Sequence, residues 1–233
     1  MKLDLLIFFK LIENESYVVI KPSNKLPDYD VGSDIDVFCY FTDKIVEKIS
    51  AFLSEYLDSS STIAIIDNPT KTHVDFMVNN EIHFRFDLYK QLPIYRNISL
   101  KPAFFSSVIE SASVISVTED NRVASIKVPS KTDDLILRYV EYHEYYAARP
   151  DKIKHVEYIQ QKIVGNEIEQ VKMLDKLHYY TAFPKVAYRK KTLKDRLVEK
   201  RDYYQSNLGK MKHLYATVGL RALICKITEK IRK

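Results

Sequence analysis

Two aspartates lie two positions apart at the start of an apolar segment, in the sequence Gly32-Ser33-Asp34-Ile35-Asp36. Because side chains alternate along a strand, both would project from one face, with Cα atoms roughly 7 Å apart. Carboxylates this close repel each other unless a cation lies between them, and Mg²⁺ and Mn²⁺ prefer such hard oxygen ligands. The sequence therefore predicts a divalent-metal site on Asp34 and Asp36.

The residues just before the aspartates strengthen this prediction. Gly32 is the only glycine in the first 164 residues. A glycine used so sparingly indicates a backbone that takes positive φ or comes close to a ligand. Ser33 adds a hydroxyl and an amide that could face a phosphate. Two aspartates around one isoleucine are common on surfaces, so the prediction depends on the elements that carry them.

The hydrophobic pattern predicts an α+β core followed by helices. Apolar residues at helical spacing predict helices over residues 3–12, 43–57 and 102–111. Strand patterns cover residues 17–20, 34–41, 62–66, 73–78 and 82–89, and a hairpin pairs 113–118 with 122–128. From Thr132 onward one helix pattern follows another. We therefore expect an α+β domain at residues 1–129, which would hold the metal site, and a helical domain at residues 130–233.

A third carboxylate has two candidates on later strands. Residues 82–89 alternate cleanly, so Arg85 and Asp87 share a face. Asp75 also lies between apolar neighbours in its strand. We favour Asp87 and keep Asp75 as the alternative. Arg85 could meet a phosphate there or pair with an acid.

The Gly-Ser-Asp-Ile-Asp motif and the order of elements over residues 3–89 resemble the polymerase-β-type nucleotidyltransferase superfamily. The resemblance implies a mixed sheet flanked by helices, with Asp34, Asp36 and Asp87 binding two Mg²⁺ (or Mn²⁺) ions and Asp87 acting as the base. It implies that an NMP group moves from an NTP to a hydroxyl or phosphate acceptor, which would be a small molecule or a glycan. The nucleotide contacts that it implies are Lys21, Ser23, Gly32, Ser33 and Arg85.

One segment departs from that family, and another narrows the resemblance. Where the family has a glycine pair or Gly-Ser, this chain reads Ile20-Lys21-Pro22-Ser23, and Pro22 removes an amide donor. The segment Leu26-Pro27-Asp28-Tyr29-Asp30 before the motif resembles the nucleotidyltransferase-like proteins of bacterial surface-polysaccharide gene clusters. That narrower resemblance implies a role in polysaccharide biosynthesis.

Two other functions remain open at the level of sequence. A glycosyltransferase could hold the diphosphate of a sugar nucleotide through Mn²⁺ on Asp34 and Asp36, although the motif opens a strand instead of following one. A non-catalytic module with the same fold would explain the missing glycine near Pro22. The retained carboxylates argue against such a module.

The basic charge is concentrated in the C-terminal part of the chain. Residues 185–233 hold 15 basic and 4 acidic residues, whereas the whole chain has a net charge of +5. This tail could pack on the body, lie on an anionic membrane surface or hold nucleic acid. Nucleic acid is the weakest of these readings, because no stacking platform of aromatics stands among the basic residues.

Cysteine usage and hydropathy bear on the compartment. The two cysteines, Cys39 and Cys225, form neither a disulfide framework nor a zinc spacing, which favours a reduced environment. No stretch approaches the ~18 apolar residues of a spanning helix. We expect a cytoplasmic protein, with peripheral contact at the inner membrane face as a further expectation.

Overall fold

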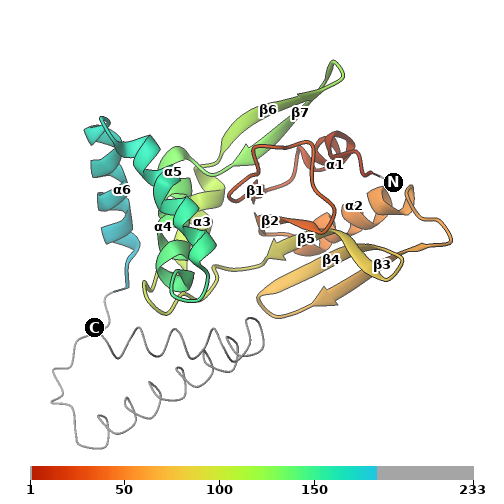
Figure 1. Cartoon of the computed structure of the whole chain (residues 1–233), viewed down its shortest axis with the longest axis horizontal. Helices are drawn as coiled ribbons and strands as arrows, with labels where there is room; N and C mark the ends of the chain where they lie inside the picture. The colour runs from red at the N-terminus through yellow and green to blue at the C-terminus, as the bar shows by residue number, and fades with distance from the viewer. Residues whose placement is uncertain (1, 183–233) are drawn as a thin grey trace, which may run out of the picture. The chain divides into compact units, whose positions relative to one another are not determined.

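The computed structural model describes residues 2–182, in which a five-stranded mixed sheet is flanked by helices (Figure 1). The strands are β1 (Tyr17–Val19), β2 (Ser33–Cys39), β3 (Ser61–Asp67), β4 (Lys71–Val78) and β5 (Glu81–Tyr89). Their order in the sheet is β1-β2-β5-β4-β3. Strands β2 and β5 are parallel, and all other neighbours are antiparallel. The predicted α+β class is confirmed.

One face of the sheet packs against two helices, α1 (Leu5–Ile12) and α2 (Thr42–Ser54). Asp4 begins α1 as its N-cap, since its carboxylate accepts hydrogen bonds from the amides of Leu6 and Ile7. The buried side chains of this core include many from the strands, such as Ile35, Val37, Val74, Phe84, Phe86 and Leu88. Because these residues alternate along their strands, the residues between them face the opposite side.

The remaining elements follow the sheet in the chain. They are α3 (Ala103–Glu110), the hairpin of β6 (Ser113–Glu119) and β7 (Arg122–Val128), α4 (Lys131–Tyr145), the 3₁₀ turn η1 (Pro150–Lys152), α5 (Ile153–Ile163) and α6 (Glu167–Tyr180). The helices share a second core with Val18 and Phe38 of the sheet and with Ile20, which follows β1. Figure 1 shows α3 to α6 grouped beyond the end of the sheet where β1 and β2 lie.

The predicted domain organisation includes a boundary near residues 129–131 and a basic C-terminal tail. The sheet and these helices belong to one compact unit, and the predicted domain boundary near residues 129–131 stays a prediction. The predicted basic tail, residues 185–233, lies outside the described residues. Within residues 2–182, none of the helices combines the length and the apolar composition that crossing a bilayer requires.

Candidate active site

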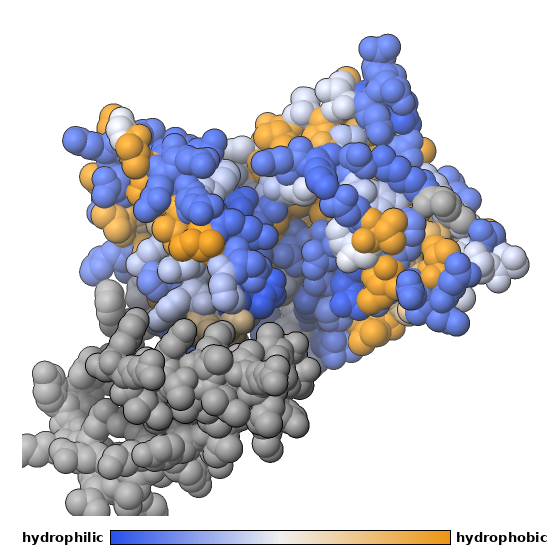
Figure 2. Space-filling model, in the orientation of Figure 1, coloured by the Kyte–Doolittle hydropathy of each residue, from blue (hydrophilic) through white to orange (hydrophobic). Residues whose placement is uncertain are grey.

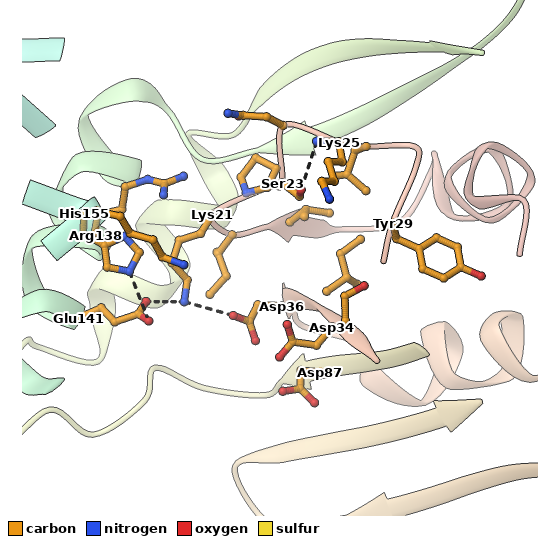
Figure 3. Close-up of a pocket in the computed structure, with 18 of the residues that line it drawn as sticks. Lys21, Ser23, Lys25, Tyr29, Asp34, Asp36, Asp87, Arg138, Glu141 and His155 are labelled. Atoms are coloured by element: carbon orange, nitrogen blue, oxygen red, sulfur yellow. Dashed lines mark hydrogen bonds and ion pairs between the residues drawn. The ribbon is translucent and has the colours of Figure 1, made fainter. Parts of the chain in front are cut away.

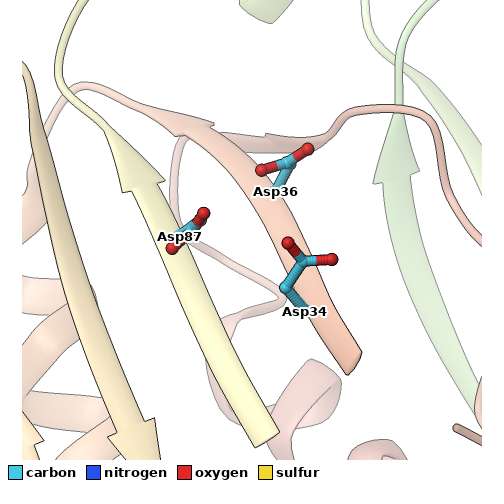
Figure 4. Close-up of side chains that lie close together, drawn as sticks. All are labelled: Asp34, Asp36 and Asp87. Atoms are coloured by element: carbon cyan, nitrogen blue, oxygen red, sulfur yellow. The ribbon is translucent and has the colours of Figure 1, made fainter. Parts of the chain in front are cut away.

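Three carboxylates meet on the face of the sheet opposite α1 and α2. Asp34 and Asp36 come from β2 and Asp87 from β5, where Asp36 and Asp87 are directly paired positions of parallel strands. One carboxylate oxygen from each lies within 4.8 Å of the other two (Figure 4). A Mg²⁺ ion bound at about 2.1 Å would hold its ligand oxygens no more than about 4.2 Å apart. The three oxygens therefore need only a small inward adjustment to hold an ion, so the residues fit a hard divalent cation.

The alternative third carboxylate, Asp75, is engaged elsewhere. It is buried on β4 and accepts hydrogen bonds of 2.6 Å from Arg85 Nε and 2.7 Å from Arg85 Nη2. A carboxylate held in this two-pronged way by a guanidinium has little reason to turn toward a metal. Of the two candidates, Asp87 is the one that the fold brings to Asp34 and Asp36. Arg85 itself is absent from the lining of the cavity described below, and its phosphate contact stays a prediction.

Asp87 is fixed by two side chains that sequence reasoning did not single out. His73 Nδ1 lies 2.6 Å from Asp87 Oδ1, and Lys71 Nζ donates to Asp87 Oδ2 over 2.8 Å. Both come from β4, in which His73 is the direct partner of Asp87 across the ladder. The signal was present in the alternation of residues 71, 73 and 75, but only the strand pairing shows that they face Asp87. Contacts of this kind orient a carboxylate that binds a metal.

Lys21 reaches the carboxylates from the loop after β1. Its ammonium group lies 3.2 Å from Asp36 Oδ2 and 2.5 Å from Glu141 Oε2 (Figure 3). Burial opposes the charged form of Lys21, but Asp36 and Glu141 outweigh it and raise the pKa of this lysine. Burial raises the pKa of Asp36, with the charges of Asp34 and Asp87 adding to the effect and Lys21 opposing it. Lys21 thus remains charged and partly compensates the acidic cluster.

Glu141, on α4, collects three basic side chains. It pairs with Lys21 and Lys152, and His155 Nε2 lies 3.6 Å from its Oε1 atom. Burial alone would raise the pKa of Glu141, but His155, Lys21 and Lys152 together hold it well below its ordinary value. This carboxylate is therefore ionised and lies in a locally basic environment.

A cavity of about 690 Å³ joins the acidic cluster to this basic environment. Figure 2 shows hydrophilic side chains around a hollow between the helices and the sheet. The basic side chains of the lining are Lys21, Lys25, Arg138, Arg149, Lys152, Lys154 and His155. Its aromatic side chains are Tyr29, Phe84, Tyr89, Tyr95, Tyr145 and Tyr158. An anionic ligand with a planar group would find both charge and ring surfaces here.

The predicted phosphate residues near the motif lie in different surroundings. Ser23 and Ser33 line the cavity. Ser33 Oγ is shielded from solvent and hydrogen-bonds to no described residue, so it is a donor without a partner. The Gly32 and Ser33 amides already donate, to the carbonyls of His83 and Asp30. Gly32 has φ +81° and does not line the cavity, so its phosphate contact stays a prediction.

Comparisons with known proteins add little to this geometry. No protein-family model matches the chain. No curated protein matches it either. Among solved structures, the chain is similar to one described as the crystal structure of the Megavirus polyadenylate synthase, with 11% sequence identity and a TM-score of 0.29. That match covers 75% of this chain and 36% of the viral chain, so it spans about a third of the viral protein's length. A similarity this low carries no conclusion about function.

Proposed function

We propose that this protein is a metal-dependent nucleotidyltransferase that moves an NMP group from an NTP to a hydroxyl or phosphate acceptor. The observation that carries the proposal is the convergence of Asp34, Asp36 and Asp87 beside a basic cavity. Bound Mg²⁺ or Mn²⁺ ions would supply charge compensation for the triphosphate and for the leaving pyrophosphate. The chain's own residues would bind, orient and move a proton.

In the proposed reaction an acceptor oxygen forms a bond to the α-phosphorus, and the bond from that phosphorus to pyrophosphate breaks. For a hydroxyl acceptor, Asp87 takes the proton, since its carboxylate is held in one orientation by His73 and Lys71. Lys21 and the hydroxyls of Ser23 and Ser33 would contact the phosphates. Transfer of this kind depends mainly on positioning and on charge stabilisation, which this cavity could provide.

The acceptor class and the setting belong to the same proposal. The loop at residues 26–30 resembles a segment of the nucleotidyltransferase-like proteins of surface-polysaccharide gene clusters. It contributes Leu26, Asp28, Tyr29 and Asp30 to the cavity lining. A ligand bound at the acidic cluster would therefore lie next to this loop, which supports a glycan acceptor in polysaccharide biosynthesis. A cytoplasmic protein with peripheral contact at the inner membrane face remains the proposed setting.

Calorimetry tests the proposal directly. ATP, CTP, GTP and UTP are titrated with and without Mg²⁺ into the wild type and into the Asp34→Asn/Asp36→Asn double variant. We expect one nucleotide to bind only with Mg²⁺, and the double variant to lose that binding. Binding of sugar nucleotides alone would indicate the glycosyltransferase, and a protein that binds no nucleotide and no divalent metal would indicate the non-catalytic module.

A further inference from the structure

Lys21 has an unusual backbone conformation at the edge of the acidic cluster. Its φ is +50°, in the left-handed region that a residue with a Cβ atom rarely adopts. Such conformations persist where surrounding contacts hold them, and they are concentrated at functional sites. Immediately before it, the amide of Ile20 donates to the carbonyl of Asp36 over 2.9 Å. The backbone of this loop is therefore tied to the strand that carries the proposed metal ligands.

The ammonium group of Lys21 is shared between two acids that belong to different walls of the cavity. Asp36 on β2 is 3.2 Å away and Glu141 on α4 is 2.5 Å away. Only about a fifth of the Lys21 and Asp36 side chains is exposed, so solvent screens this contact less than it screens surface pairs. Because both acids are within reach, Lys21 can break its ion pair with Asp36 and still keep Glu141 as a charged partner.

A metal ion on Asp36 would compete with Lys21. An ion coordinated at about 2.1 Å by Asp36 Oδ2 would lie within roughly 5 Å of the ammonium group. Two cations at that distance in a partly buried site repel each other strongly. A second ion would need further carboxylate oxygens from Asp34, Asp36 and Asp87, and the Asp36 oxygen beside Lys21 is one of those available. Full occupation of the site therefore requires Lys21 to move away from Asp36.

We propose that Lys21 is a built-in counterion which makes the acidic cluster select a metal–polyphosphate complex over a free divalent cation. A free ion has to displace Lys21 without offering it a new anion. A metal–polyphosphate complex brings that anion, because its phosphate oxygens take over the ammonium group as Lys21 leaves Asp36. This inference rests on the proposed metal site and adds a specificity-determining residue to it.

The test measures the affinity for Mn²⁺ alone by the paramagnetic resonance signal of the unbound ion, in buffer free of phosphate and nucleotide. The Lys21→Met variant is expected to bind Mn²⁺ at least about fivefold more tightly than the wild type, the lower end of usual coupling between sites. The Glu141→Gln variant is expected to bind it more weakly, because Lys21 is then left with Asp36 as its only acid. A tighter site cannot be the result of misfolding.

The matched control is Lys25→Met. Lys25 lines the same cavity from the same loop, but it pairs with Asp30 and is mostly exposed. Its removal is expected to leave Mn²⁺ affinity unchanged. Calorimetry with a magnesium–tripolyphosphate complex should show the opposite change in affinity. Lys21→Met is expected to weaken the binding of this complex, while it strengthens the binding of the free ion.

The outcomes separate this inference from the metal site beneath it. Equal or weaker Mn²⁺ binding by Lys21→Met, with binding lost in Asp34→Asn, would overturn the role of Lys21 and leave the metal site standing. An equal gain in Mn²⁺ affinity in Lys25→Met would show that the loss of any nearby positive charge has this effect. That result would also overturn the role of Lys21. No Mn²⁺ binding by any variant would overturn both proposals.

Discussion

Arg85 holds Asp75 through two hydrogen bonds, from Nε to Oδ1 over 2.6 Å and from Nη2 to Oδ2 over 2.7 Å. The two residues are directly paired across β4 and β5, two positions along the ladder from the pair of His73 and Asp87. The two pairs lie on the same face of the sheet, since only the pair of Val74 and Phe86 separates them, and each carries one acid with a different partner. Asp75 is held by the guanidinium of Arg85, whereas Asp87 faces the aspartates of β2.

This difference predicts that the same substitution has different effects at the two acids. Asp87→Asn is expected to lower Mn²⁺ affinity by about 10-fold or more, because it removes a charged ligand. Asp75→Asn is expected to leave Mn²⁺ affinity nearly unchanged and to lower the free energy of unfolding by about 1–3 kcal/mol, since Arg85 loses its charged partner. Titration with Mn²⁺ and denaturant unfolding on both variants provide the check. Loss of metal binding in Asp75→Asn alone would reverse the assignment.

A second prediction concerns the glycine before the motif. Gly32 has φ +81° and Gly165 has φ +73°, and an added Cβ would meet no atom closer than 3.8 Å at the first and none within 4 Å at the second. Replacement by alanine is therefore penalised by backbone strain alone, at about 1–2 kcal/mol for each. Both variants should lose similar stability in thermal unfolding. Only Gly32→Ala should also weaken Mn²⁺ binding. The backbone shifts that relieve its strain would occur next to Ser33 and Asp34.

Removal of the Ser33 hydroxyl should affect the stability of the protein and its binding of polyphosphate in different ways. Ser33 Oγ is shielded from solvent and has no hydrogen-bond partner among residues 2–182. Ser33→Ala removes an unsatisfied polar group, so the free energy of unfolding should stay equal or rise by up to about 1 kcal/mol. Binding of magnesium–tripolyphosphate, measured by calorimetry, should weaken several-fold. A variant that loses stability and keeps full binding would show that the hydroxyl serves the fold.

The pH dependence of stability should reflect His83, whose ring contacts those of Tyr29 and Phe76. Burial lowers the pKa of His83 below 6.5, and its ring accepts or donates one hydrogen bond of 3.1 Å with the Tyr29 hydroxyl. The unfolded chain then binds this proton at higher pH than the folded chain does. The contribution is complete above about pH 6.5 and is lost as the pH falls through the lower folded value.

His83→Gln tests this sign, because glutamine can still bond to Tyr29 and does not titrate. Between pH 7 and pH 5 the wild type should lose more stability than the variant, and each ~1 kcal/mol should correspond to about 2–4 °C in Tm for a chain of this size. Thermal unfolding in matched buffers measures the difference. An equal fall of Tm in both proteins would exclude His83 as a source.

Much of the sheet could be predicted because its strands alternate or run apolar over their full length. The pairing could not, and pairing decides the site. Asp75 and Asp87 look alike in sequence, and only the antiparallel register of β4 with β5 gives Arg85 to one and His73 to the other. Alternation along a strand shows which face a residue shares, but not which neighbour lies across from it.

The basic side of the cavity was harder to predict, because its contacts join distant segments. Lys21 and Glu141 are separated by 120 positions in sequence. Residues 149–155 include Arg149, Lys152, Lys154 and His155. In the structure, Lys152 and His155 lie beside Glu141, while Arg149 pairs with Asp151. No local sequence pattern could show that Glu141 on α4 would contact these basic side chains.

One lysine connects the two walls of the cavity, since its ammonium group touches an acid of the sheet and an acid of a helix. The two walls also share a buried hydrophobic core, which contains Val18 and Phe38 of the sheet, so the lysine adds a polar link to an apolar one. A ligand that draws Lys21 toward itself also removes this brace between strand and helix. Filling the cavity would therefore exchange a polar contact between strand and helix for contacts with the ligand, while the apolar contacts stay in place.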